Sequence, residues 1–179
     1  MANKKEEFLI STFEVLKGEQ LKRIEFRDRM IYLTLVAIGG VFSFAIENSN
    51  YNSALLVLPF IITVLGWMYL VNDIKITKIG NYCSKVILPK FEGSKKEGFS
   101  LHPTWEEYYR SSTKRKLRKN IQLIVDLSVF CLSSLFSIAA FYFIEKDIII
   151  QTHILIIIEV LIIFFLGSQI VSNNPIYKK

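Results

Sequence analysis

The stretch Ile148–Val171, IIIQTHILIIIEVLIIFFLGSQIV, decides the fold: it is 24 residues long and carries one charged residue, Glu159. A helix needs about 20 apolar residues to cross a hydrocarbon layer of ~30 Å, so this stretch predicts a membrane-spanning helix. Three more apolar runs precede it, at 30–46, 54–71 and 121–144, and only the last of these carries a charge, Asp126. We therefore expect an all-α integral membrane protein with four transmembrane helices and cytoplasmic helical extensions.

A soluble protein with buried core helices is the alternative. Four apolar runs of 17 to 24 residues in a chain of 179 would leave such a protein too little polar helix surface to face water. The membrane interpretation accounts for the same runs without that difficulty.

Positive charge is distributed unevenly around the apolar runs. Of the 22 Lys and Arg residues, seven lie before residue 30, 12 lie in residues 72–120 and two follow residue 171. The loop 47–53 holds none and the loop 145–147 holds one. Because cytoplasmic loops carry an excess of Lys and Arg, both termini and the long middle segment are expected in the cytoplasm.

The expected organisation follows from these boundaries. It consists of a cytoplasmic N-terminal helix at 1–29, transmembrane helices 1 and 2 within 30–71, a cytoplasmic helical region at 72–120, transmembrane helices 3 and 4 within 121–171, and a cytoplasmic tail at 172–179.

The cytoplasmic parts are predicted to be helical, without β-sheet in residues 73–120. No Pro separates the N-terminal segment from the first span, so one helix is expected to run through both. After the second span, an apolar stripe at helical spacing predicts a further amphipathic helix, which Pro89 is expected to end. The stripe consists of Ile79, Tyr82, Cys83 and Val86.

The two charged residues within spans are the main candidates for an intramembrane polar site. A charge inside a span costs about 2.5–3.5 kcal/mol and usually faces the bundle interior or a water-filled path. Asp126, Ser133 and Ser137 share one face of the third span, and Glu159 lies at the middle of the fourth. The two acids are expected to differ by about 9 Å in depth and not to touch within one subunit.

Glu159 is expected to face protein, with Ser133, Ser134 or Glu159 of a second subunit as its nearest partner. Two roles stay open: a protonated carboxyl that serves only packing, and one of several carboxylates that line an ion path in an oligomer. Trp67 and Tyr69, near the inner end of the second span, are expected to be interfacial anchors.

A basic run precedes the third span and consists of Lys114, Arg115, Lys116, Arg118 and Lys119. Its position predicts contact with anionic lipid headgroups. The alternative is a site for a nucleotide, phosphate or nucleic acid, but no Gly-rich phosphate loop accompanies the run. We do not expect direct nucleic-acid binding.

The sequence offers little catalytic chemistry. Its two His and two Cys residues show no zinc-ligand spacing, and neither an HExxH sequence nor a nucleophile elbow occurs. We expect no enzyme, no catalytic residue, no cofactor and no metal site.

Three segments carry a resemblance to small bacterial membrane proteins. They are Arg23-Ile24 with Arg27-Asp28-Arg29 before the first span, Asp73–Tyr82 after the second, and Trp105-Glu106-Glu107-Tyr108. The chain resembles the membrane effectors of anti-phage defence, such as the SLATT-type two-span effectors and the membrane component of Kiwa-type systems. Its four spans depart from the two-span class.

The resemblance implies a homo-oligomer in the bacterial inner membrane that couples a cytoplasmic signal, or a partner encoded in the same operon, to a membrane response such as permeabilisation. Two alternatives stay open: a small ion channel or transporter subunit, and a non-catalytic membrane anchor for a cytoplasmic partner. The expected partners are the lipid bilayer, anionic lipids and further copies of the chain.

Overall fold

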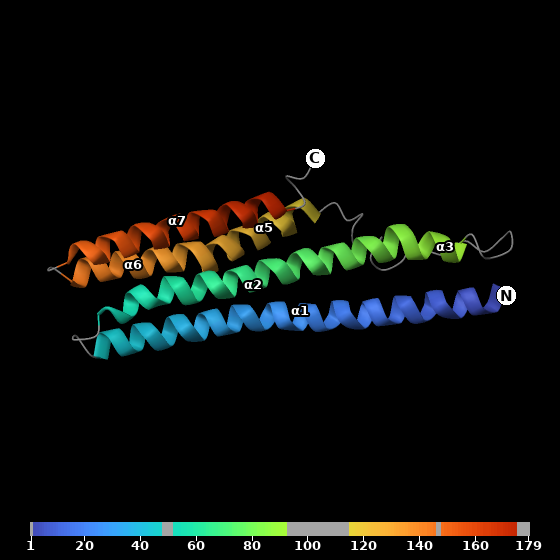
Figure 1. Cartoon of the computed structure of the whole chain (residues 1–179), viewed down its shortest axis with the longest axis horizontal. Coiled ribbons are helices and arrows are strands. Elements are labelled where there is room, and N and C mark those ends of the chain that lie inside the picture. Colours follow the sequence, from blue (N-terminus) through green and yellow to red (C-terminus); the bar gives the residue numbers. More distant parts are fainter. Residues whose placement is uncertain (1, 48–51, 93–114, 146–147, 175–179) are drawn as a thin grey trace. The chain divides into compact units, whose positions relative to one another are not determined.

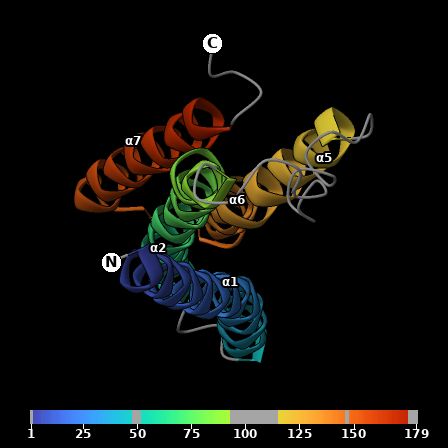
Figure 2. The ribbon, with the colours of Figure 1, turned by 90° about the vertical axis from the view of Figure 1, so that its right-hand side faces the viewer.

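The computed structural model describes residues 2–47, 52–92, 115–145 and 148–174, and over these residues the chain is helical with short turns (Figure 1, Figure 2). The elements in chain order are α1 (Ala2–Glu47), α2 (Ala54–Tyr82), the π-helical turn η2 (Cys83–Ile87), α3 (Leu88–Glu92), α5 (Arg115–Leu127), the π-helical turn η3 (Ser128–Leu132), α6 (Ser133–Ile144) and α7 (Ile150–Asn173). No strand occurs among the described residues. The predicted all-α class is confirmed for this part of the chain.

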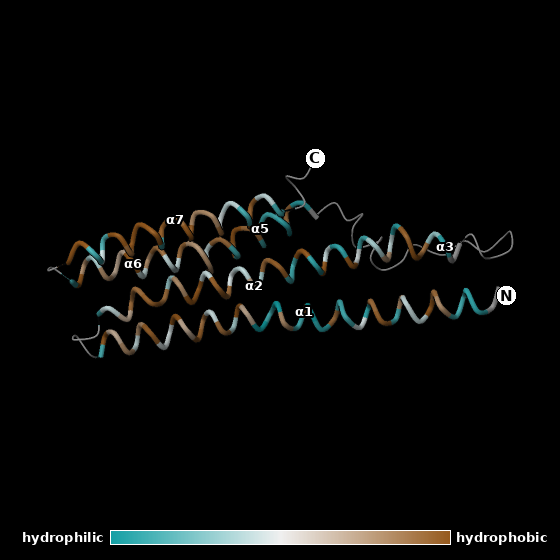
Figure 3. Tube along the Cα trace, viewed as in Figure 1, coloured by the Kyte–Doolittle hydropathy of each residue, from teal (hydrophilic) through white to brown (hydrophobic). Residues whose placement is uncertain are grey.

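Four helical segments are long and apolar enough to cross a membrane, as the sequence predicted. They are Lys4–Glu47, Ala54–Lys90, Lys116–Ile144 and Ile150–Asn173. Figure 3 shows α6 and α7 mainly in brown, whereas the first half of α1 has many teal positions. The expectation that one helix runs from the N-terminal segment into the first apolar run is also confirmed, because α1 continues from Ala2 to Glu47.

The chain forms two compact units. The first contains residues 1–27 and 71–116, and the second contains residues 28–70 and 117–179. The second unit holds the apolar runs and an apolar core to which α1, α2, α6 and α7 all contribute. Its buried members are Ala45, Leu55, Leu56, Ile138, Phe141, Ile156 and Ile163. Apolar side chains at helical spacing thus bring the four apolar helices of this unit together.

Gly66 lies at a close contact between helices in the second unit. A Cβ atom at this position would lie 2.8 Å from Leu166 Cδ2 and 3.0 Å from Phe130 Cδ1. Only glycine leaves room for these two side chains, so α2 packs tightly against both η3 and α7. The ring of Phe130 is completely buried and lies 5.0 Å from the Tyr69 ring, centroid to centroid.

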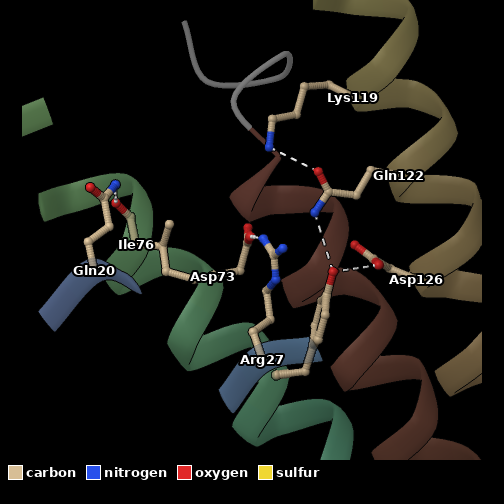
Figure 4. A network of polar contacts seen from close by, with 8 residues as sticks. Gln20, Arg27, Asp73, Ile76, Lys119, Gln122 and Asp126 are labelled. Carbon is tan, nitrogen blue, oxygen red and sulfur yellow. Dashed lines mark hydrogen bonds and ion pairs between the residues drawn. The ribbon is translucent and has the colours of Figure 1, made fainter. Parts of the chain in front are cut away.

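In the first unit, polar side chains of α1 contact the later part of α2. Gln20 Nε2 donates to the backbone oxygen of Ile76 at 3.2 Å, and Arg27 Nη1 lies 3.0 Å from Asp73 Oδ1 (Figure 4). The later residue of α1, Arg27, contacts the earlier residue of α2, Asp73, so the two segments are antiparallel.

Pro89 does not end the helix that follows the second apolar run, so this prediction was wrong. The chain passes through η2 into α3, which contains Pro89. A proline ring clashes with the carbonyl four residues earlier in an α-helix. The turn before it is wider: the backbone N–H of Leu88 donates to the oxygen of Cys83, five residues back. This extra width accommodates the proline.

The same wide turn changes the buried stripe. Cys83 is buried as predicted, and Ile87 replaces Val86 as the buried residue of the next turn. Tyr82 comes before η2 and is 48% exposed, so its exposure is not an effect of the wide turn. A π-helical turn inserts one extra residue, which rotates every later side chain relative to a regular helix. The prediction of helix without sheet holds for 73–92 and 115–120, and 93–114 lies outside the described residues.

Candidate functional site

A buried pair, Tyr69 and Asp126, forms the centre of the candidate site in the second unit. The Tyr69 hydroxyl donates to Asp126 Oδ1 at 2.7 Å, and the two residues are 3% and 8% exposed (Figure 4). Tyr69 comes from α2 and Asp126 from α5. A hydrogen bond to a carboxyl is among the stronger ones in proteins, so this buried contact joins the two helices firmly.

The pair continues into a chain of polar contacts towards the start of α5. Gln122 Nε2 donates to the Tyr69 hydroxyl at 3.3 Å, and Lys119 Nζ donates to Gln122 Oε1 at 3.1 Å. Asn174 Nδ2 reaches the backbone oxygen of Lys119 at 3.4 Å, which ties the end of α7 to the same place. Figure 4 shows the links from Lys119 to Asp126 as one continuous path.

Sequence reasoning selected Asp126 but missed its partner. Tyr69 was expected to be an interfacial anchor, and it is instead buried. A tyrosine near the end of an apolar run suits an interface and a buried hydrogen bond equally well, since one end of the side chain is apolar and the other polar. The signal that could have paired them is depth in the membrane. Tyr69 and Asp126 each lie near the end of their apolar run that borders residues 72–120.

Glu159 lies on the buried face of α7, 6% exposed, between Ile156 and Ile163. The prediction that it faces protein is confirmed. Its Oε2 atom is completely buried and accepts no hydrogen bond from any described residue. Such an atom in an apolar setting costs free energy unless the carboxyl is protonated or meets a group from outside this chain.

The expected serine partners of Glu159 are engaged elsewhere. Ser133 Oγ donates to the backbone oxygen of Val129, and Ser134 Oγ donates to that of Phe130 at 2.8 Å. Both serines therefore bond their own helix. The remaining candidate from the sequence, Glu159 of a second subunit, stays a prediction.

The polar face of the third apolar run differs from the predicted one. Ser134 and Ser137 are completely buried, whereas Ser133 is only partly buried. The π-helical turn η3 lies between Asp126 and these serines and adds one residue, so Ser134 is buried in place of Ser133, whereas Ser137 remains on the buried face. Ser137 Oγ donates to the backbone oxygen of Leu55 at 2.6 Å and links α6 to α2.

The basic run is described only in part. Lys114 lies outside the described residues, and Arg115 is placed only as the first residue of α5. Lys116 is exposed, while Arg118 and Lys119 are partly buried. Lys119 belongs to the polar chain that leads to Asp126, a role the sequence did not indicate.

The first unit brings together two of the segments that carry the resemblance stated above. Arg23 Nη1 donates to Asn72 Oδ1 at 3.3 Å, next to the Arg27–Asp73 ion pair at 3.0 Å. Arg23 and Arg27 belong to the segment before the first apolar run, and Asp73 opens the segment after the second. The third segment, with Trp105, lies outside the described residues.

In the part of the chain that the structure describes, no group of three or more His, Cys, Asp or Glu side chains is close enough to hold a metal ion. Neither Cys83 nor Cys131 forms a disulfide bond among the described residues.

Comparisons of the chain with family models, with curated proteins and with solved structures find no match.

Proposed function

We propose that the chain is an integral protein of the bacterial inner membrane with four spans and with both termini and residues 72–120 in the cytoplasm. Four long apolar helices support this placement, as does their exposure: only 17%, 44%, 28% and 28% of their apolar windows, in chain order, is buried within the chain. Soluble proteins rarely expose apolar patches beyond a few hundred Å². The distribution of Lys and Arg supports the orientation.

Cysteine labelling tests the orientation. Ser53 and Lys78 are both exposed, and the two natural cysteines can be changed to serine to give a silent background. An impermeant maleimide added to intact cells is expected to label Ser53→Cys and not Lys78→Cys. Labelling of Lys78→Cys in intact cells would refute the topology.

Within that topology, the proposed function is a homo-oligomeric effector or sensor that converts a cytoplasmic signal, or contact with an operon-encoded partner, into a membrane response such as permeabilisation. The observation that carries it is that α1 and α2 each contribute to both compact units as continuous helices. A continuous helix can transmit a displacement because its interior is closely packed and stiff. The resemblance stated above supports anti-phage defence as the setting.

The exposed face of α1 supports the oligomer. Its apolar window is the least buried of the four, and nothing lies within 4 Å of a Cβ atom built at Gly39 or Gly40. Small residues at such a position allow two membrane helices to approach closely.

Glu159 is the group through which the spans are proposed to respond. Buried carboxyls in spans commonly serve ion paths and proton relays, and the unpartnered Oε2 atom of Glu159 suits such a role. A membrane-potential dye, followed in cells that express the chain with and without its operon, measures the response. Glu159→Gln is expected to keep assembly and to abolish depolarisation, whereas Glu145→Gln, the control, is expected to keep both.

The same experiment separates the alternatives. Depolarisation that does not depend on the operon favours a small ion channel or transporter subunit. The absence of any dye response in the wild type, with the chain fully inserted, favours a non-catalytic anchor. An unchanged response in Glu159→Gln would refute the role of the carboxyl and leave packing as its function.

A further inference from the structure

An apolar groove lies between the third apolar run and α7 in the second unit. It has a volume of about 520 Å³, is open along one side, and is lined almost entirely by apolar atoms. Its walls include Leu127, Cys131, Leu135, Phe164, Gly167 and Val171. This volume lies in the range of pockets that hold small molecules.

Gly167 lines the groove on α7, and the groove is deeper there because glycine has no side chain. A Cβ atom there would lie 3.3 Å from the Cys131 sulfur, so α7 and η3 meet closely behind the groove. The groove is therefore a hollow between two packed helices rather than a gap left by poor packing.

The groove covers only one half of the span. Its lining on α7 runs from Val160, next to the mid-span Glu159, to Ser172 at the end of the helix. Twelve residues of helix rise correspond to about 18 Å, close to the ~15 Å of one leaflet. On the other wall it begins at Leu127, the last residue of α5.

The end of the groove is the basic end of the unit. Asn174, two residues after Ser172, hydrogen-bonds the backbone oxygen of Lys119, so Lys119 lies beside the end of α7. Cations with long apolar stems reach the headgroup level from such a position. Under the proposed topology this end faces the cytoplasmic leaflet, where anionic lipids attract about 1 kcal/mol per cation.

We propose that this groove holds one acyl chain of an anionic phospholipid from the cytoplasmic leaflet, whose phosphate is bound by Lys119. The proposal rests on the membrane placement proposed above. It assigns to the chain a phospholipid site next to the Tyr69–Asp126 pair, because Lys119 also heads the polar path to that pair.

The test is native mass spectrometry of the full chain released from nanodiscs made of equal parts phosphatidylglycerol and phosphatidylcholine. The wild type is expected to retain one phosphatidylglycerol per chain in preference to phosphatidylcholine. Leu135→Trp, which fills the groove, is expected to lose that lipid, and Phe136→Trp, which changes the neighbouring exposed residue outside the groove, is expected to keep it.

The charge is tested separately. Lys119→Gln is expected to lower the preference for phosphatidylglycerol about fivefold, from one cation at about 1 kcal/mol. Lys78→Gln removes the same charge from an exposed position in the first unit and is expected to leave the preference unchanged.

Three results would overturn the proposal: equal retention of the two lipids by the wild type, retention unchanged in Leu135→Trp, or cross-linking of Cys131 between two chains on mild oxidation, which would place a second copy in the groove. Each of these leaves the chain inserted in the nanodisc. Failure to insert would instead count against the membrane placement itself.

Discussion

Removing the Tyr69 hydroxyl tests the central contact of the candidate site. Tyr69→Phe keeps the ring against Phe130 but deletes the donor to Asp126 Oδ1 at 2.7 Å. Hydrogen bonds to charged groups contribute about 1.5–3 kcal/mol in soluble proteins, whereas those between membrane helices average about 0.6 and reach about 1.7 kcal/mol. The bond is short and both residues are buried, so we expect a loss of about 1.5 kcal/mol, roughly tenfold in the folding equilibrium.

Reversible unfolding in mixed lipid–detergent micelles measures this loss. A double-mutant cycle with Asp126→Ala isolates the coupling between the two side chains, which is expected to be about 1 kcal/mol. Tyr142→Phe is the matched control, because the Tyr142 hydroxyl bonds His153 Nδ1 at 3.0 Å on the exposed surface. Its expected change is below about 0.5 kcal/mol. Equal stabilities for Tyr69→Phe and Tyr142→Phe would refute the argument.

Two further substitutions test the packing of the second unit by the same unfolding assay. Gly66→Ala is expected to destabilise by about 1–3 kcal/mol, because its Cβ atom would lie 2.8 Å from a leucine side chain, whereas Gly18→Ala, with nothing within 4 Å, is expected to be neutral or slightly stabilising. A neutral Gly66→Ala would contradict the close approach of the helices. Ser137→Ala removes a 2.6 Å hydrogen bond between helices and is expected to cost about 0.6–1.7 kcal/mol of stability. Ser133→Ala loses only a hydrogen bond within its own helix and is expected to change stability little. A larger loss for Ser133→Ala than for Ser137→Ala would show that η3 does not place these serines as described.

The departures from the sequence-based expectations have one main physical cause. Periodicity arguments assume a regular helix of 3.6 residues per turn, and both π-helical turns break that assumption. The exchange of Ser133 for Ser134 and of Val86 for Ile87 on the buried faces follows from η3 and η2. The sequence of each segment is compatible with a regular α-helix and with a π-helical turn. Which of the two forms depends on the side chains that the helix packs against.

The sequence by itself determined the four apolar helices, because hydropathy and length are properties of each segment alone. It also singled out Asp126 and Glu159, because a charge within an apolar run is costly wherever the run packs. Only the tertiary structure decided that Asp126 pairs with Tyr69, 57 residues away, and that Glu159 keeps a buried oxygen without a partner. These outcomes depend on which faces of which helices meet, and that is settled by packing between segments far apart in the chain.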